Sequence, residues 1–238
     1  MSTAFEREAR DLARSIATYW QRQLGPRLHG VYLIGSLAHG GFSDRYSDID
    51  MGVTTEDGLT QTEIDAMRAH ARDLSPGLAP KLSLFWGDRG FTIGRFPPLD
   101  RLDYLDRPVV LAERERVTPA PPALEEIRDY LRGAPFANWA NRAHEFAGAL
   151  TLDAKDRKAY LRALLYPARL CFSYATGRMT SNDHAVAYLR EQTPPGLDLA
   201  PIEQALQCRQ AAADPDSLFE LRGSLPAQVD ACAALLAT

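Results

Sequence analysis

Cysteine is scarce in this sequence of 238 residues, and its scarcity excludes two kinds of protein. The three cysteines, Cys171, Cys208 and Cys232, are odd in number and no two of them form a CxxC pair. Small disulfide-stapled domains and structural zinc sites both depend on closely spaced cysteines. The sequence therefore predicts neither of these. Few, unpaired cysteines are typical of a reducing compartment, which favours a cytoplasmic protein.

Long apolar runs and an excess of basic residues are missing as well. No apolar run is long enough to cross a membrane, and the charged first ten residues do not resemble a secretory signal. The 27 Lys and Arg residues are outnumbered by 31 Asp and Glu, which gives a formal net charge of -4. General nucleic-acid binders usually need a basic surface to release counterions from the phosphate backbone. We therefore expect no membrane partner and no general nucleic-acid binding. The net negative charge still allows a local basic pocket for one nucleotide.

Two hydrophobic patterns divide the chain at the proline-rich segment TPAPPA, residues 118–123. Before it, helical spacing alternates with short strand-like stretches. We expect helices at 4–24 and 60–74, the second capped by Thr62, and strands at 30–35, 48–53, 81–86 and 108–112, with 87–108 irregular. After it, only helical patterns occur, at 124–132, 136–152, 155–176, 181–191, 200–212 and 217–236. The prediction is an α+β fold, with a mixed or antiparallel sheet and helices in residues 1–118 and an all-α domain in residues 119–238.

The residues that carry chemistry are concentrated between residues 30 and 53. An apolar strand ends in Gly35-Ser36, a turn-rich segment follows, and Asp48 and Asp50 lie on the next strand. Because Gly35 has no Cβ, a triphosphate can approach its backbone closely. Ser36 adds hydroxyl and amide donors at the start of a short helix, where an anion is favoured. Residues two apart on a strand face the same side, so the two carboxylates are expected to lie together.

Two neighbouring carboxylates repel each other unless a cation lies between them. Mg²⁺ prefers oxygen ligands and is commonly shared with phosphates. It neutralises charge on the α-phosphate while a hydroxyl attacks and pyrophosphate leaves. An isolated DxD is common at solvated strand ends, but its combination with Gly35-Ser36 at short range favours a magnesium–nucleotide site. We therefore predict that ATP or another NTP binds here and that a nucleoside monophosphate is transferred to an acceptor.

The stretch LIGSLAHGGFSDRYSDIDMGV resembles the signature of the polymerase-β-like nucleotidyltransferases. Its GS, GG and YSDID elements are similar to those of the aminoglycoside adenylyltransferases that modify streptomycin and spectinomycin. The resemblance implies that Gly35, Ser36 and Ser47 contact the triphosphate and that Asp48 and Asp50 hold magnesium. It also implies a small-molecule hydroxyl acceptor, such as an antibiotic, held in a cleft between two domains.

A weaker match lies in the helical half of the chain. The segments Ala168-Arg169-Leu170, ATG at 175–177 and SNDHA at 181–185 resemble the C-terminal domain of the same family. By this resemblance Arg169 contributes to nucleotide binding and Asp183 pairs with a cationic acceptor. The alternative role for Asp183 is that of a helix-start residue after Ser181.

The sequence departs from this family at the third carboxylate. Members usually carry an acidic residue on a later strand, as general base or metal ligand, and the stretch KLSLFW has Ser83 at that position. A serine hydroxyl is a poor base at neutral pH. Asp88, which we assign as the catalytic candidate, and Glu145 are the possible substitutes, and a site without a third carboxylate is the remaining alternative.

This gap leaves two competing interpretations of function. A nucleotide-binding or regulatory module that has lost catalysis would carry the same motif, and Ser83 favours it. A transferase of the same fold could also modify a protein side chain. The helical half speaks against that second interpretation, because minimal protein-modifying members typically lack it.

Overall fold

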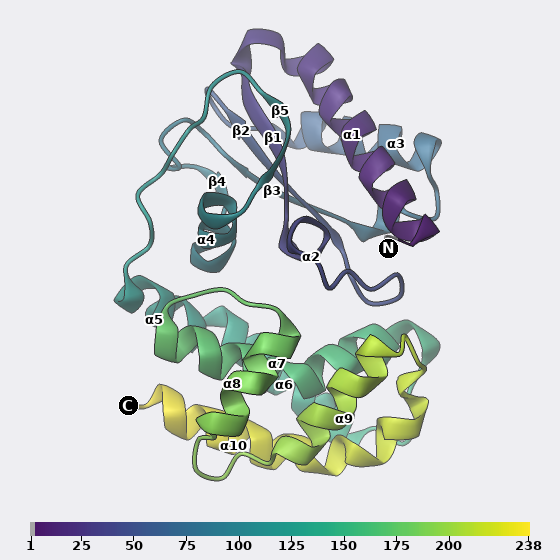
Figure 1. Ribbon diagram of the computed structural model, residues 1–238, viewed down its shortest axis with the longest axis vertical. Coiled ribbons are helices and arrows are strands. Elements are labelled where there is room, and N and C mark those ends of the chain that lie inside the picture. Colours follow the sequence, from purple (N-terminus) through teal and green to yellow (C-terminus); the bar gives the residue numbers. More distant parts are fainter. Residues whose placement is uncertain (1–2) are drawn as a thin grey trace. The chain divides into compact units, whose positions relative to one another are not determined.

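The structure, a computed structural model, describes residues 3–238, which divide into two compact units between Pro121 and Pro122. Every strand in this described part belongs to the first unit, and the second is built from helices (Figure 1). The α+β class predicted from the sequence is therefore confirmed. The division falls inside the proline-rich segment 118–123.

A five-stranded mixed sheet organises the first unit. Its strands lie in the order β4-β3-β2-β1-β5. They are β1 (Leu28–Ile34), β2 (Ile49–Thr55), β3 (Leu82–Gly87), β4 (Gly94–Arg95) and β5 (Val109–Glu113). Strands β2 and β3 are parallel, whereas all other neighbours are antiparallel. Helix α3 (Gln61–Leu74) provides the crossover that a parallel pair requires.

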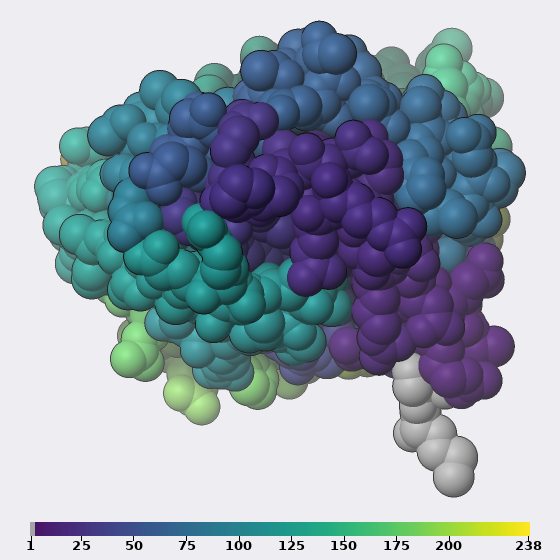
Figure 2. Space-filling view, turned by 90° about the horizontal axis from the view of Figure 1, so that it is seen from above, coloured from purple at the N-terminus to yellow at the C-terminus, as the bar shows by residue number. Residues whose placement is uncertain are grey.

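Helices α1 (Ala4–Leu24) and α3 bury the main core against one face of the sheet. The apolar positions of α1 recur at helical spacing, and Ile16 and Trp20 are fully buried. They pack with strand residues such as Val31 and Met51, which point to this face. Figure 2 shows the purple N-terminal segment packed between the blue α3 region and the teal segment that contains β5, in agreement with the contacts of α1.

The start of α3 differs from the prediction by two residues. The cap is Thr60, whose hydroxyl accepts from the Glu63 amide while the Glu63 carboxylate accepts from the Thr60 amide. This reciprocal capping box satisfies two donors at the helix end that Thr62, inside the first turn, cannot serve. The predicted cap at Thr62 is therefore wrong.

The opposite face of the sheet carries a smaller, mostly aromatic cluster. Tyr32 and Ile34 of β1 point to this face and pack with Phe85 and with Tyr104 of α4 (Pro98–Asp106). Residues 87–108 are predicted to be irregular, but they contain β4 and α4, so the prediction is wrong there. Prolines 97 and 98 look like helix breakers, but proline is well tolerated in the first turn of a helix.

The second unit is a bundle arranged around α7 (Arg157–Thr176). This helix contacts every other α-helix of the unit. These are α5 (Leu124–Arg132), α6 (Ala134–Gly148), α8 (Asn182–Glu191), α9 (Leu199–Gln210) and α10 (Leu225–Leu236). The segment 217–236 was predicted as one helix, but 3₁₀ turns at Pro215–Ser224 precede α10, which has Pro226 in its first turn. Within residues 3–238, no helix combines the length and the apolar character needed to span a membrane.

Candidate active site

Gly35 lies at the point where β1 ends and the short helix α2 (Gly35–His39) begins. Its φ of +68° is in the left-handed region, which side chains other than glycine's rarely allow. A Cβ on Gly35 would also lie 2.4 Å from the Asp50 Oδ2 atom. Only glycine therefore serves here, and the Asp50 carboxylate rests directly against this turn.

Asp48 and Asp50 share one side of the chain at the start of β2. Ile49, between them, is fully buried in the main core, whereas both aspartates are partly exposed. This alternation places the two carboxylates on the sheet face opposite α1 and α3. Their oxygen atoms suit Mg²⁺, and the missing Cβ of Gly35 is what allows the Asp50 carboxylate to lie at this turn. The pair could therefore hold magnesium, with phosphate oxygens and water as the further ligands.

The residue next to Asp50 on the neighbouring strand is Ser83. The two are register partners in the parallel β2–β3 pair, so their side chains project to the same face. The position at which the family resemblance implies a third carboxylate is thus occupied by a hydroxyl. In the described part of the chain, no three His, Cys, Asp or Glu side chains are grouped so that they could hold a metal ion.

Ser36 and Ser47 connect α2 to the loop that precedes Asp48. The Ser36 hydroxyl donates to Ser47 Oγ over 3.0 Å, and the Ser43 amide donates to the same oxygen over 2.9 Å. Lys81 closes the loop from outside by donating to the Asp44 and Ser47 carbonyls. Ser47 is only 3% exposed. Ser47 therefore orders the loop, and its predicted contact with the triphosphate stays a prediction.

Asp103, which is not among the residues predicted from the sequence, is hydrogen-bonded to the same turn. Its Oδ2 accepts from the Gly35 amide over 2.6 Å, and its Oδ1 lies 2.5 Å from His39 Nε2. Asp103 is 8% exposed, so this carboxylate is almost completely enclosed by its partners. The available signal was the pattern LDRLDYLD after Pro98, in which Leu99, Leu102 and Leu105 have helical spacing.

The aromatic cluster fixes the helix that carries Asp103. The neighbouring Tyr104 is fully buried and its hydroxyl donates to the Val117 carbonyl over 2.5 Å. Its ring meets the Tyr32 ring edge-on, with centroids 5.0 Å apart, and lies near Gly52 of β2, where a Cβ would come within 3.1 Å of the Phe96 ring. Burial is also the main reason why the pKa of Tyr104 is raised. Asp103 is therefore held rigidly over the sheet face that carries Asp50.

Asp88 does not occupy the catalytic position predicted for it. It follows Gly87, which pairs with Thr54 at the opposite end of β2, roughly 13 Å along the strand from Asp50. Its carboxylate accepts from the Thr92 and Ile93 amides over 2.7 and 2.9 Å. Burial acts to raise the pKa of Asp88, but these hydrogen bonds outweigh it and lower the pKa below its usual value. Asp88 stabilises this turn, and its contacts do not favour the role of base, which stays a prediction.

The predicted residues of the second unit make contacts within that unit. Exposed Arg169 on α7 contacts the Met179 sulfur at 3.5 Å, and Asp183 in the first turn of α8 accepts from Gln210 over 2.5 Å. Ser181, one position before α8, accepts from the His184 amide and is the cap of that helix. These contacts do not test nucleotide or acceptor binding, so both roles remain predictions.

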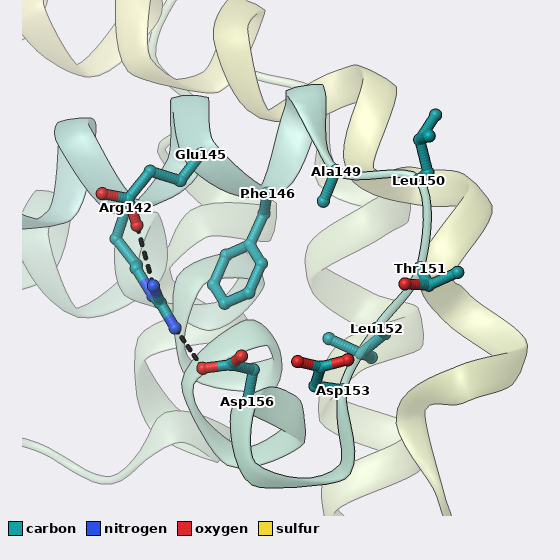
Figure 3. A pocket seen from close by; sticks show the side chains of 9 residues that line it. All are labelled: Arg142, Glu145, Phe146, Ala149, Leu150, Thr151, Leu152, Asp153 and Asp156. Atoms are coloured by element: carbon teal, nitrogen blue, oxygen red, sulfur yellow. Dashed lines mark hydrogen bonds and ion pairs between the residues drawn. The ribbon is translucent and has the colours of Figure 1, made fainter.

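Glu145 lies at a pocket of the helical unit, between the end of α6 and the segment that follows it (Figure 3). Its carboxylate pairs with Arg142 over 2.8 Å, and the same guanidinium bridges to Asp156. Asp153 also lines the pocket. Because Arg142 neutralises two of the three carboxylates, Glu145 is already engaged in an ion pair and is not poised as a free base.

The order of elements now defines a class of fold. A strand followed by Gly-Ser, a short helix, a second strand that begins within Asp-x-Asp and a following helical unit form the order that the sequence predicted. The chain is similar in structure to spectinomycin adenyltransferase AAD(9) from Enterococcus faecialis, crystallised with ATP and spectinomycin. The TM-score is 0.65 at 13% sequence identity, covering 98% of this chain and 99% of that chain. No family model and no curated protein sequence matches the chain. At this identity the likeness establishes the fold.

Proposed function

We propose that this protein is a magnesium-dependent nucleotidyltransferase that moves a nucleoside monophosphate, AMP from ATP, to a hydroxyl of a small molecule. The observation that carries the proposal is the position of the Asp50 carboxylate against Gly35, with Asp48 on the same side of β2. A fold shared with an adenyltransferase adds support. An aminoglycoside is the acceptor class that the fold relative suggests, since that protein was crystallised with spectinomycin.

Four residues of this chain would bind magnesium and the triphosphate. Asp48 and Asp50 would hold magnesium, which supplies charge neutralisation for the triphosphate when it is bound. The absence of a Cβ at Gly35 lets the Asp50 carboxylate lie against the backbone, and the Ser36 hydroxyl can turn from Ser47 to donate to a phosphate oxygen. The acceptor oxygen then attacks the α-phosphorus, and the bond to pyrophosphate breaks. The hydroxyl proton must leave in the same reaction, which requires a base or water.

A second candidate function is a nucleotide-binding module without transfer activity. Ser83 favours it, because a hydroxyl stands beside Asp50 where a third carboxylate would complete the metal site. Both functions require Asp48 and Asp50 for nucleotide binding. They differ only in whether pyrophosphate is released.

Pyrophosphate release from ATP, measured with Mg²⁺ and a panel of aminoglycosides, separates the two functions. A transferase releases pyrophosphate with at least one acceptor, and Asp50→Asn reduces the rate by about 100-fold or more, because several kcal/mol of charge stabilisation are lost. The matched control is Asp65→Asn, an exposed aspartate on α3, which should leave the rate unchanged. Magnesium-dependent ATP binding without release for any acceptor would select the module. Full activity in Asp50→Asn would contradict both.

A further inference from the structure

His39 and Asp103 form a carboxylate–imidazole pair at the turn that also holds Gly35. The two side chains come from different elements, α2 and α4, and are 22% and 10% exposed. His39 Nε2 lies 2.5 Å from Asp103 Oδ1, while Asp103 Oδ2 accepts from the Gly35 amide. The Gly35 amide therefore meets Asp103, and the place that a Gly35 Cβ would take is occupied by the Asp50 carboxylate. The pair is thus part of the same cluster as the predicted metal ligand.

The hydrogen bond to Asp103 determines which nitrogen of His39 can act as a base. An ionised carboxylate only accepts hydrogen bonds, so Nε2 carries the proton and donates to Asp103. In the neutral ring the lone pair is then on Nδ1. Within residues 3–238, Nδ1 has no hydrogen-bond partner, and the partly exposed ring can be reached from solvent. A histidine oriented by a carboxylate, with its second nitrogen free, is the arrangement that general-base catalysis uses.

The neighbouring positions show why a base is needed here. Ser83, beside Asp50, is a poor base, and Asp88 is bound up in a turn at the far end of the strand. Asp103 is almost buried, and each of its two oxygens is engaged, one with the Gly35 amide and one with His39. His39 is the group in this cluster that combines basicity with an unused acceptor atom.

We propose that His39 accepts the proton of the attacking hydroxyl and that Asp103 is its positioning residue. The proposal rests on the function proposed above. In the step, the acceptor oxygen forms a bond to the α-phosphorus of the nucleoside triphosphate, and the bond between that phosphorus and the pyrophosphate oxygen breaks. Pyrophosphate leaves with the electron pair, and the hydroxyl proton passes to His39 Nδ1. Release of that proton to water restores the neutral ring.

Several charged groups surround α2 and face this pair. Asp103 faces the ring from α4, and Asp48 and Asp50 lie at the start of β2. From α1, Arg10 donates to the Leu37 carbonyl and is paired with Glu6. Because protonated His39 cannot accept a proton, the transfer rate should rise with pH over the range in which histidines titrate, roughly pH 5 to 8.

The first test measures the tautomer without any substrate. Two-dimensional ¹⁵N NMR of the full-length protein should show His39 protonated at Nε2 and unprotonated at Nδ1 at the upper end of that range. In Asp103→Asn the preference for this tautomer should be lost. A wild-type ring with its proton on Nδ1, or one charged throughout the range, overturns the proposal whatever the protein's activity.

The second test uses His39→Gln, whose side-chain amide can still donate to Asp103 but cannot take a proton. Single-turnover pyrophosphate release from ATP and Mg²⁺ should slow by roughly 100-fold or more, and the rise with pH should disappear. ATP binding, measured by calorimetry, should stay within about twofold of the wild type. The control is His70→Gln. His70 stacks on Tyr19 and lies on α3, the helix that covers the opposite face of the sheet.

The outcomes separate this inference from the proposed function. If the wild type released pyrophosphate and His39→Gln did so with the same rate and pH profile, the role of His39 would be overturned. The proposed transferase function would then be unaffected. Loss of ATP binding in His39→Gln would reduce the pair to a structural one and overturn the inference as well. Absence of release by the wild type with every acceptor would overturn both.

Discussion

Asp50 and Ser83 are register partners on the parallel strands β2 and β3, so a carboxylate and a hydroxyl stand side by side on one sheet face. Replacing the hydroxyl by a carboxylate, as in Ser83→Asp, should place a third acidic group next to Asp50. Like charges on neighbouring strands repel, so without metal we expect a loss of about 1 kcal/mol in the free energy of unfolding. Magnesium should reverse this loss of stability, because it would bind both the Asp50 carboxylate and the new one.

Thermal unfolding with and without Mg²⁺ checks this prediction. The control is Ser15→Asp on the exposed side of α1, whose stability should not depend on magnesium. If Mg²⁺ shifted the unfolding of Ser83→Asp no more than that of the control, Ser83 would not face a metal position.

Gly35→Ala should abolish nucleotide binding and lower stability. The left-handed φ costs about 1–2 kcal/mol for alanine, and the new Cβ would lie 2.4 Å from Asp50 Oδ2. Gly40→Ala is the matched control, because Gly40 also has a positive φ but a Cβ there meets open space. We expect both variants to unfold more easily, and only Gly35→Ala to lose ATP binding in a calorimetric titration. If both variants bound ATP equally well, the Gly35 turn would not be part of the nucleotide site.

Asp88→Asn should change stability in a pH-dependent way and leave transfer unaffected. The pKa of Asp88 is lowered in the folded state from its ordinary value of 3.8, although burial opposes this. Its stabilising contribution is therefore fully present above pH 3.8 and is lost as the pH falls through the folded-state pKa. Denaturant unfolding of wild type and Asp88→Asn should differ at neutral pH and converge in acid. A loss of transfer with unchanged stability would restore the catalytic assignment.

Asp183→Asn should weaken the binding of a cationic acceptor by about tenfold, the size expected when a charged hydrogen-bond partner is lost. Its carboxylate is exposed and its contact in the structure is to the neutral Gln210 amide, so it can exchange partners. Calorimetric titration of spectinomycin, with Asp129→Asn as an exposed control on α5, measures the effect. Identical affinities for the two variants would leave Asp183 with its role at the start of α8.

The sequence was sufficient for the parts of the site that depend on local patterns. Gly35-Ser36 ends an apolar strand, and the alternation Asp48-Ile49-Asp50 is visible without a structure because side chains on a strand alternate between faces. The position of Ser83 followed from aligning a third apolar strand, and the register of β2 and β3 places it beside Asp50.

The rest of the site depends on contacts between distant segments, which periodicity does not reveal. Asp103 reaches Gly35 only because Tyr104 packs α4 on the aromatic side of the sheet, and that helix is short and begins with proline. Likewise, Asp88 looks available in the sequence, whereas the backbone of the following turn folds around its carboxylate. The role of the Ser47 hydroxyl was also hidden in the sequence, because its partner Ser36 lies eleven residues away.

The central claim is that Asp50 binds nucleotide through magnesium, and calorimetric titration of ATP with and without excess EDTA tests it most directly. The wild type should bind ATP at least about tenfold more tightly with Mg²⁺ than with EDTA. Asp50→Asn should bind ATP equally weakly under both conditions, with its thermal unfolding close to that of the wild type. Equal, tight binding by wild type and Asp50→Asn, with or without the metal, would contradict the account.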